Sequence, residues 1–186
     1  MKHPTREECE NLLEEYQTPA HVRAHCREVA RVACVVGRAL KEKGAALDLE
    51  LILAAGLLHD IARVEDKHWE VGADLLEKLG YGAESEIVRA HMFYSPFSDI
   101  GDVTETDLVC LGDRLVKEDR YVGLDDRIEY VVRKAVRNGH EDAVPIIMKK
   151  KQETIRFMGQ IEAMVGCSID RLVEGIDGPW AGMEKS

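Results

Sequence analysis

The stretch LELILAAGLLHDIA, residues 49–62, is apolar nearly all round. This pattern predicts a helix that runs through the middle of the domain rather than over its surface. Asp48 stands before it as a predicted N-cap. The far end of the stretch carries His59 and Asp60, two ionisable residues whose burial costs free energy when they have no partner. The sequence therefore predicts a buried helix with a polar site at its end.

Apolar residues spaced three and four apart predict further helices on both sides of this stretch. Thr18 and Pro19 are the predicted N-cap and first residue of a helix that ends at Gly44. Later helices are expected at about 68–79, 84–93, 105–120, 126–138 and 143–165, and the longest loop at 94–105. Because alternating strand patterns are essentially absent, we expect an all-α, single-domain helical bundle over residues 1–186.

Charge and cysteine content exclude several classes of protein. Lys and Arg number 25 and Asp and Glu 35, so the formal net charge is −10, which disfavours non-specific binding to nucleic acid. The five cysteines form no C-x-x-C pair, and neither a disulfide framework nor a thiolate zinc site is expected. Without a signal-peptide pattern or a membrane-spanning stretch, the sequence predicts a cytoplasmic protein that binds no membrane.

Six ionisable residues lie on apolar faces of the predicted helices. They are His25, His59, Asp60, His68, His91 and Asp113. Any one of them alone is more simply explained as a hydrogen-bonded core residue. Together in one small core, however, they are most easily satisfied by a shared metal site. Imidazoles and carboxylates without thiolates favour Fe, Mn, Co or Ni over Mg, and six ligands suffice for one or two ions with Asp60 as a bridge.

The motifs around these residues resemble the HD-domain superfamily of metal-dependent phosphohydrolases over residues 20–120. HVRAHCREVARVA (21–33) is similar to the first motif of that family, LLHDIAR (57–63) to its signature, and CLGDRLVKEDR (110–120) to its closing Asp motif. The closing motif commonly has Ala before the Asp, where this chain has Gly112.

Two further motifs resemble those of the binuclear branch of the superfamily. KHWEVGADLLEKLGY (67–81) and IVRAHMF (87–93) match its extra histidine motifs, which implies that His68 and His91 hold a second ion. The resemblance also implies a metal-site core at about 20–120, C-terminal helices at about 126–175 and a loose tail at 176–186.

The resemblance implies hydrolysis of a phosphomonoester or phosphodiester of a small metabolite by metal-activated water, with Asp60 as a catalytic residue. A nucleotide is the usual substrate of such enzymes. The chain contains no Gly-rich phosphate loop and no nucleotide fingerprint, so this expectation comes from the resemblance alone.

Basic residues near the ligands are candidates for phosphate contacts. Arg63 follows His59 by four residues, where many binuclear relatives carry a lysine, and we predict that it is a catalytic residue that contacts the phosphoryl group. Arg114 and Arg120, on either side of the turn after Asp113, are further candidates for substrate binding. Lys134 and the lysines at 149–151 are expected on solvated helix faces without a role in the site.

Two other functions remain open from the sequence. The same ligand types serve a mixed-valent di-iron oxygenase of the HD type, similar to inositol oxygenase. A non-catalytic module that binds a nucleotide and signals to a partner is a third interpretation, which the intact set of ligands disfavours.

Overall fold

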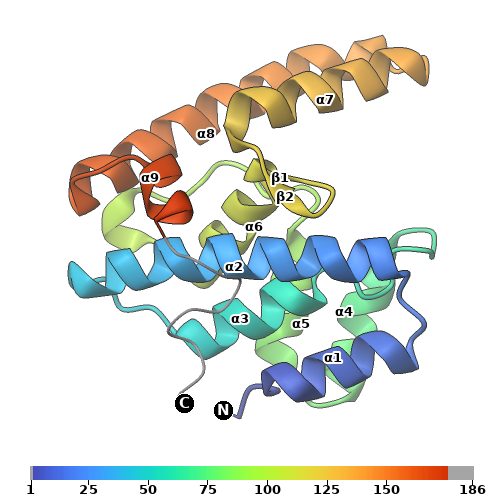
Figure 1. The fold of residues 1–186 in the computed structure, drawn as a ribbon. Helices are drawn as coiled ribbons and strands as arrows, with labels where there is room; N and C mark the ends of the chain where they lie inside the picture. The colour runs from blue at the N-terminus through green and yellow to red at the C-terminus, as the bar shows by residue number, and fades with distance from the viewer. Residues whose placement is uncertain (1, 176–186) are drawn as a thin grey trace.

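The computed structural model describes residues 2–175, and in these residues the predicted all-α fold is confirmed (Figure 1). The α-helices are α1 Arg6–Glu15, α2 Ala20–Glu42, α3 Leu49–Leu58, α4 His68–Lys78, α5 Gly82–Ala90, α6 Glu105–Leu115, α7 Gly123–Arg137, α8 Val144–Val165 and α9 Ile169–Glu174. Shorter elements are the 3-10 helices η1 Ile100–Asp102 and η2 Glu141–Ala143 and the strands β1 Val116–Lys117 and β2 Arg120–Tyr121. The predicted tail at 176–186 lies outside the described residues.

Helix α2 crosses the middle of the molecule, with α1, α3, α4 and α5 on one side and α6, α7 and α8 on the other (Figure 1). It packs most extensively against α3 and α6. Two apolar clusters fill the interior, one containing Ile52 and Phe157 and the other Leu57 and Leu76. Since α3 contributes to both clusters, it is buried on nearly all sides, as its composition predicts. No helix of the described part of the chain is long and apolar enough to cross a membrane.

The ends of two helices differ from the prediction because of contacts with distant parts of the chain. Thr18 does not cap α2, whose N-cap is Pro19; its hydroxyl donates to the Ile61 carbonyl instead, at 2.7 Å. Helix α3 ends at Leu58, so His59 and Asp60 lie in the turns that follow it rather than within the helix. The hydrogen bond from Thr18 thus connects these turns to the segment directly before α2.

The segment after Asp113 differs more strongly from the predicted secondary structure. The helix predicted at 105–120 ends at Leu115, because β1 pairs with β2 in a short antiparallel hairpin. Glu118 adopts a φ of 55° at the tip of this hairpin, a left-handed conformation that a helix does not allow. Helices α5 and α7 begin two and three residues earlier than predicted, and the region of C-terminal helices predicted at about 126–175 includes a separate six-residue helix, α9.

A close approach of α6 to α2 explains the glycine before Asp113. A Cβ at Gly112 would lie 2.8 Å from the Val29 carbonyl oxygen, closer than real Cβ contacts allow. That oxygen belongs to the backbone of α2 and cannot rotate aside. The alanine that is common at this position in similar proteins therefore does not fit here.

We expect Gly112→Ala to lower the free energy of unfolding by about 1 to 3 kcal/mol, the usual cost of overpacking a core. Urea unfolding of the metal-free protein measures it. The matched control is Gly159→Ala on α8, where an added Cβ meets no atom within 4 Å. This control should keep or raise stability by up to about 1 kcal/mol. Equal stability of Gly112→Ala and the parent would contradict the close approach.

Candidate metal centre

The six predicted ligands come together from five segments of the chain. They are His25 on α2, His59 and Asp60 in the turns after α3, His68 at the start of α4, His91 at the end of α5, and Asp113 on α6. The left-handed conformation of Lys67, with φ at 50°, begins α4 and directs its first residue to the cluster. Residues that lie far apart in the sequence thus form one polar cluster in the core.

Asp60 lies at the centre of this cluster. Its Oδ1 is 3.1 Å from His68 Nε2 and 3.6 Å from His91 Nε2, and its Oδ2 is 3.8 Å from His59 Nε2. Two sets of three residues each offer ligand atoms that lie within 4.8 Å of one another, namely His25 with His59 and Asp60, and Asp60 with His68 and His91. Because Asp60 belongs to both sets, its carboxylate has the position of a bridging ligand.

Asp113 joins the cluster through His25, whose Nε2 is 3.1 Å from Asp113 Oδ1. It belongs to neither of the two sets of three found among the described residues. Asp113 lies beside the first set, and its role as a further ligand of that set stays a prediction.

The hydrogen bonds of the histidines prepare them to bind a metal. Nδ1 of His25, His59 and His91 donates to the carbonyls of Glu118, Gly56 and Val88 at 2.7, 2.9 and 2.6 Å. A carbonyl only accepts, so each of these Nδ1 atoms carries a proton, and when the ring is neutral its Nε2 is unprotonated and faces the cluster. Such bonds from the far nitrogen orient histidine ligands in metal sites.

Two buried nitrogen atoms in the cluster have no hydrogen-bond partner among residues 2–175. They are Nε2 of His59 and Nε2 of His68, the latter close to Asp60 but badly oriented for a hydrogen bond. A buried polar atom without a partner costs about 1 to 3 kcal/mol. A divalent ion would satisfy both atoms, so the residues present fit a metal.

The pKa shifts of Asp60, Asp113 and His59 favour the protonation states that metal ligands need. Burial alone would raise the pKa of Asp60, but His59, His68 and His91 hold it well below its usual value. Burial likewise opposes ionisation of Asp113, whose pKa His25 and His59 nevertheless keep low. Burial lowers the pKa of His59 and so favours its neutral form. Ionised carboxylates and a neutral imidazole are the metal-binding forms of these groups.

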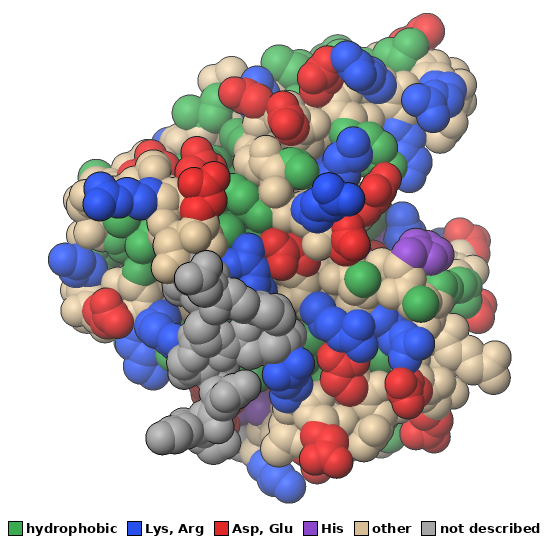
Figure 2. Space-filling model, in the orientation of Figure 1, with side chains coloured by type: hydrophobic (Ala, Val, Ile, Leu, Met, Phe, Trp, Pro, Cys, Tyr) green, Lys and Arg blue, Asp and Glu red, His purple; other side chains and the backbone are tan. Residues whose placement is uncertain are grey.

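A cavity of about 770 Å³ opens onto the cluster. Five of the six predicted ligands line it, all except His59. Helices α7 and α8 contribute Arg127, Lys134 and Lys150 to its wall. Figure 2 shows the surface hollowed where α7 overhangs the start of α2, with a histidine and several basic side chains at the edge. The volume is in the range of sites for small metabolites.

The structure places the three predicted arginines differently. Arg63 lines the cavity and lies near the cluster, with Nε 3.3 Å from Asp60 Oδ2 and Nη1 3.3 Å from His68 Nδ1. The spacing of four residues predicts that Arg63 and His59 share a helix face, but this is wrong, because both residues lie in turns after α3. Arg114 lines the cavity, but its guanidinium donates to Thr154 and the Tyr94 carbonyl. Arg120 has a side chain 83% exposed and does not line the cavity.

Three basic residues of the cavity were missed by the sequence analysis. Arg127 was not among the predicted site residues, and Lys134 is exposed, as expected, although its side chain also lines the cavity. Lys150 had a detectable signal, since it precedes the buried Thr154 and Phe157 by four and seven residues and thus shares their helix face.

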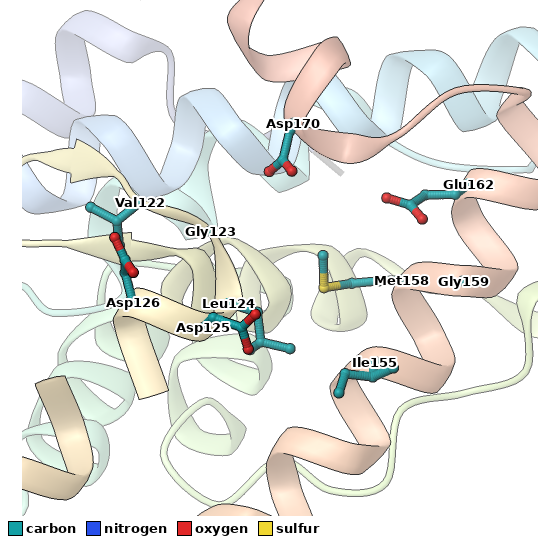
Figure 3. A pocket seen from close by; sticks show the side chains of 10 residues that line it. All are labelled: Val122, Gly123, Leu124, Asp125, Asp126, Ile155, Met158, Gly159, Glu162 and Asp170. Atoms are coloured by element: carbon teal, nitrogen blue, oxygen red, sulfur yellow. The ribbon is translucent and has the colours of Figure 1, made fainter. Parts of the chain in front are cut away.

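A second cavity, of about 480 Å³, is lined by acidic rather than basic side chains (Figure 3). Carboxylates from α7, α8 and α9 surround it: Asp125, Asp126, Glu162 and Asp170. Its charge repels a phosphorylated ligand. The cavity at the metal centre is therefore the better candidate for a phosphate site.

We expect the stability lost in His25→Gln to depend on pH in the metal-free protein. Burial alone would lower the pKa of His25, but its hydrogen bond with Asp113 raises it above its usual value of 6.5. The ion pair therefore stabilises fully below that pH and is lost as the pH rises through the folded-state pKa. Urea unfolding in EDTA should show a larger loss at about pH 6 than at about pH 9. Equal losses would contradict the ion pair.

Two known proteins are similar in sequence to this chain. An uncharacterized protein of Methanocaldococcus jannaschii is 28% identical over 130 residues, which cover 61% of this chain and 77% of that protein. The tRNA (cytidine(56)-2'-O)-methyltransferase of Thermoplasma volcanium is 25% identical over 174 residues, which cover 84% of this chain and 48% of that protein. The chain thus spans about half the length of the Thermoplasma relative. No solved structure matches significantly.

A family comparison gives the broader relationship. Residues 22–130 match the HD domain family, a stretch that holds all six predicted ligands and covers more than half of the chain. These residues follow one another along the sequence in the order that the resemblance implies, and the structure brings them together in one cluster, which agrees with that match. The chain belongs to the HD-domain family.

Proposed function

We propose that the chain is a metal-dependent phosphohydrolase that cleaves a phosphomonoester or phosphodiester of a small metabolite. The observation that carries the proposal is the Asp60 carboxylate, which is shared between two sets of imidazoles in the wall of a cavity that also collects basic side chains. The net charge of −10 opposes binding of a long polyanion. A nucleotide is the substrate class that the likeness to HD-domain proteins favours.

In this proposal the ligands form two metal sites that share Asp60. His25, His59 and Asp113 would hold one ion with it, and His68 and His91 a second. Ions bound there supply a lowered pKa for water and polarise phosphoryl oxygens. The chain itself contributes the rigid orientation of the imidazoles, through the carbonyl groups that accept from their Nδ1 atoms.

Arg63 is the residue that we assign to the phosphoryl group. Its side chain is 43% exposed and lines the cavity beside Asp60 and His68. A guanidinium in this place can donate to two phosphoryl oxygens and neutralise the charge that develops on them. Arg114 keeps a lesser role in the proposal, because its donors are engaged within the protein.

We expect the protein to bind two transition-metal ions per chain and His68→Ala to bind one. The second set of ligands loses one of its three members in this variant, whereas the first set is intact. Asp60→Ala should lose both ions, since both sets share this residue. Elemental analysis after dialysis against Mn, Fe, Co or Ni measures the ratio. His140→Ala, at an exposed histidine, is the control and should bind as the parent does. Saturation of the parent at one ion would contradict the two-ion assignment.

The activity test uses a panel of phosphomonoesters and phosphodiesters with each of these metals. Asp60→Ala should lose turnover together with bound metal. Arg63→Ala should keep the metal and lose roughly 2 to 4 kcal/mol of transition-state stabilisation, the usual cost of removing one preorganised donor. Arg133→Ala, on an exposed face of α7, is the control for loss of a positive charge.

Two outcomes would replace the hydrolase. Oxygen consumption by the iron-loaded protein, with no phosphate released from any ester, would support the di-iron oxygenase. Nucleotide binding without either reaction would support a non-catalytic module. Turnover by Arg63→Ala at the parent rate would leave hydrolysis standing and move the phosphate contact to another residue.

A further inference from the structure

The three consecutive lysines of α8 differ in their surroundings. Lys151 forms an ion pair with Asp125 at 2.6 Å, and Lys149 is exposed. Lys150 instead lines the cavity at the metal centre, where its Nζ is 3.4 Å from the Met92 carbonyl. No carboxylate among residues 2–175 lies within ion-pair distance of it. Lys150 is thus a partly buried cation without an anionic partner in the described structure.

Helix α7 places a row of cations along the same cavity. Arg127 begins the row, with its Nε 3.4 Å from the Asp113 carbonyl and its Nη2 3.9 Å from the carboxylate. Lys134 stands seven residues, or two turns, further along and lines the cavity as well. With a rise of 1.5 Å per residue, the two positions are roughly 10 Å apart along the helix axis. The row therefore leads away from the metal ligands.

Lys134 is exposed whereas Lys150 is half-buried, but both line the cavity and lack an ion-pair partner among residues 2–175. Within the part of the chain that the structure describes, Lys134 has no ion pair and no side-chain hydrogen bond. The neighbouring Arg133, in contrast, pairs with Glu129 on the exposed face of α7. Two unpaired ammonium groups, one from each helix of the α7–α8 pair, thus line a cavity whose other wall carries the ligands.

If the scissile phosphoryl group were the only anionic group of the substrate, these two lysines would have no anion to bind. Arg63 lies beside Asp60, whereas Lys134 lies about two helical turns beyond Arg127. Burial and the nearby Arg114 lower the pKa of Lys150, and an anion bound beside it would offset both effects. The cavity of about 770 Å³ is also far larger than a phosphoryl group.

We propose that the substrate carries a second anionic group, a phosphate or a carboxylate, which Lys134 and Lys150 bind while the scissile phosphoryl group lies at the metal ligands. This inference rests on the proposed phosphohydrolase function and narrows its substrate class. The substrate is a small metabolite with two separated anionic groups, rather than a simple monoester.

The test compares three substrates with the same six-carbon chain. They are 6-hydroxyhexyl phosphate, 6-phosphonooxyhexanoate and 1,6-hexanediol bisphosphate, which differ in whether the far end is neutral, a carboxylate or a phosphate. We expect kcat/KM for at least one doubly anionic compound to exceed that of the hydroxyl compound by about 10-fold or more, as one or two charge-assisted hydrogen bonds provide. The compound with the higher value identifies the second anion.

The decisive variant is Lys134→Gln/Lys150→Gln. In this variant, the ratio of kcat/KM for the preferred doubly anionic compound to kcat/KM for the hydroxyl compound should fall close to one. Its matched control is Arg133→Gln/Lys149→Gln, which removes the same charge from the same two helices outside the cavity and should keep the ratio. Equal unfolding midpoints for both variants show that folding is intact. A parent ratio near one, or a ratio that survives in the decisive variant, would overturn the inference.

A second readout does not depend on metal or turnover. Calorimetry in EDTA with hexane-1,6-bisphosphonate, which cannot be hydrolysed, should show binding that the decisive variant weakens about 10-fold and the control keeps. If no compound is hydrolysed with any metal but this difference persists, the phosphohydrolase proposal fails and the anion site stands. If hydrolysis occurs but neither readout depends on the two lysines, the anion site fails and the hydrolase stands.

Discussion

The buried carboxylate of Asp60 is the interaction on which the rest of the structure depends. An ionised carboxylate in an apolar interior costs several kcal/mol unless partners surround it. Its partners are His59, His68 and His91, so α3, α4 and α5 must all end or begin at the same place. The apolar character of α3 fits this requirement, because a helix buried on nearly all sides holds the carboxylate in a rigid, mostly apolar place at the edge of the cavity.

Close packing around α2 decides whether the first set of ligands can form. Gly56 on α3 and Gly112 on α6 both face α2, where an added Cβ would come within 2.8 Å of the Ala30 Cα and the Val29 carbonyl. Gly56 also accepts the hydrogen bond from His59 Nδ1. Side chains of ordinary size at these two positions would push α3 and α6 outward. The 3.1 Å contact between His25 and Asp113 depends on the closeness of these helices.

The distribution of charge matters more for this protein than its sum. The chain is acidic overall, and the cavity among α7, α8 and α9 is lined by carboxylates (Figure 3). Basic residues nevertheless gather in the cavity at the candidate metal centre. A net negative charge keeps long polyanions away, while a local group of cations attracts a small anion. Both properties suit an enzyme that acts on a small phosphorylated compound.

The sequence by itself determined the fold class and the set of candidate ligands. Helix periodicity is a local property, and it correctly assigned most of the helices. Histidines and carboxylates on apolar faces stand out because burial without partners is costly, which identified the group that the structure brings together around Asp60.

Only the tertiary structure decided where helices stop and which basic residues enter the site. Thr18 bonds to Ile61, 43 residues away, and α6 ends in a hairpin; neither contact has a signal in the local pattern. Arg63 reaches Asp60 from a turn, not from a helix face. Lys149 and Lys150 are adjacent and chemically identical, and only the packing of α8 against α7 and α2 places one in solvent and the other in the cavity. The physical reason is that the surroundings of a flexible charged side chain are set by neighbours distant in sequence.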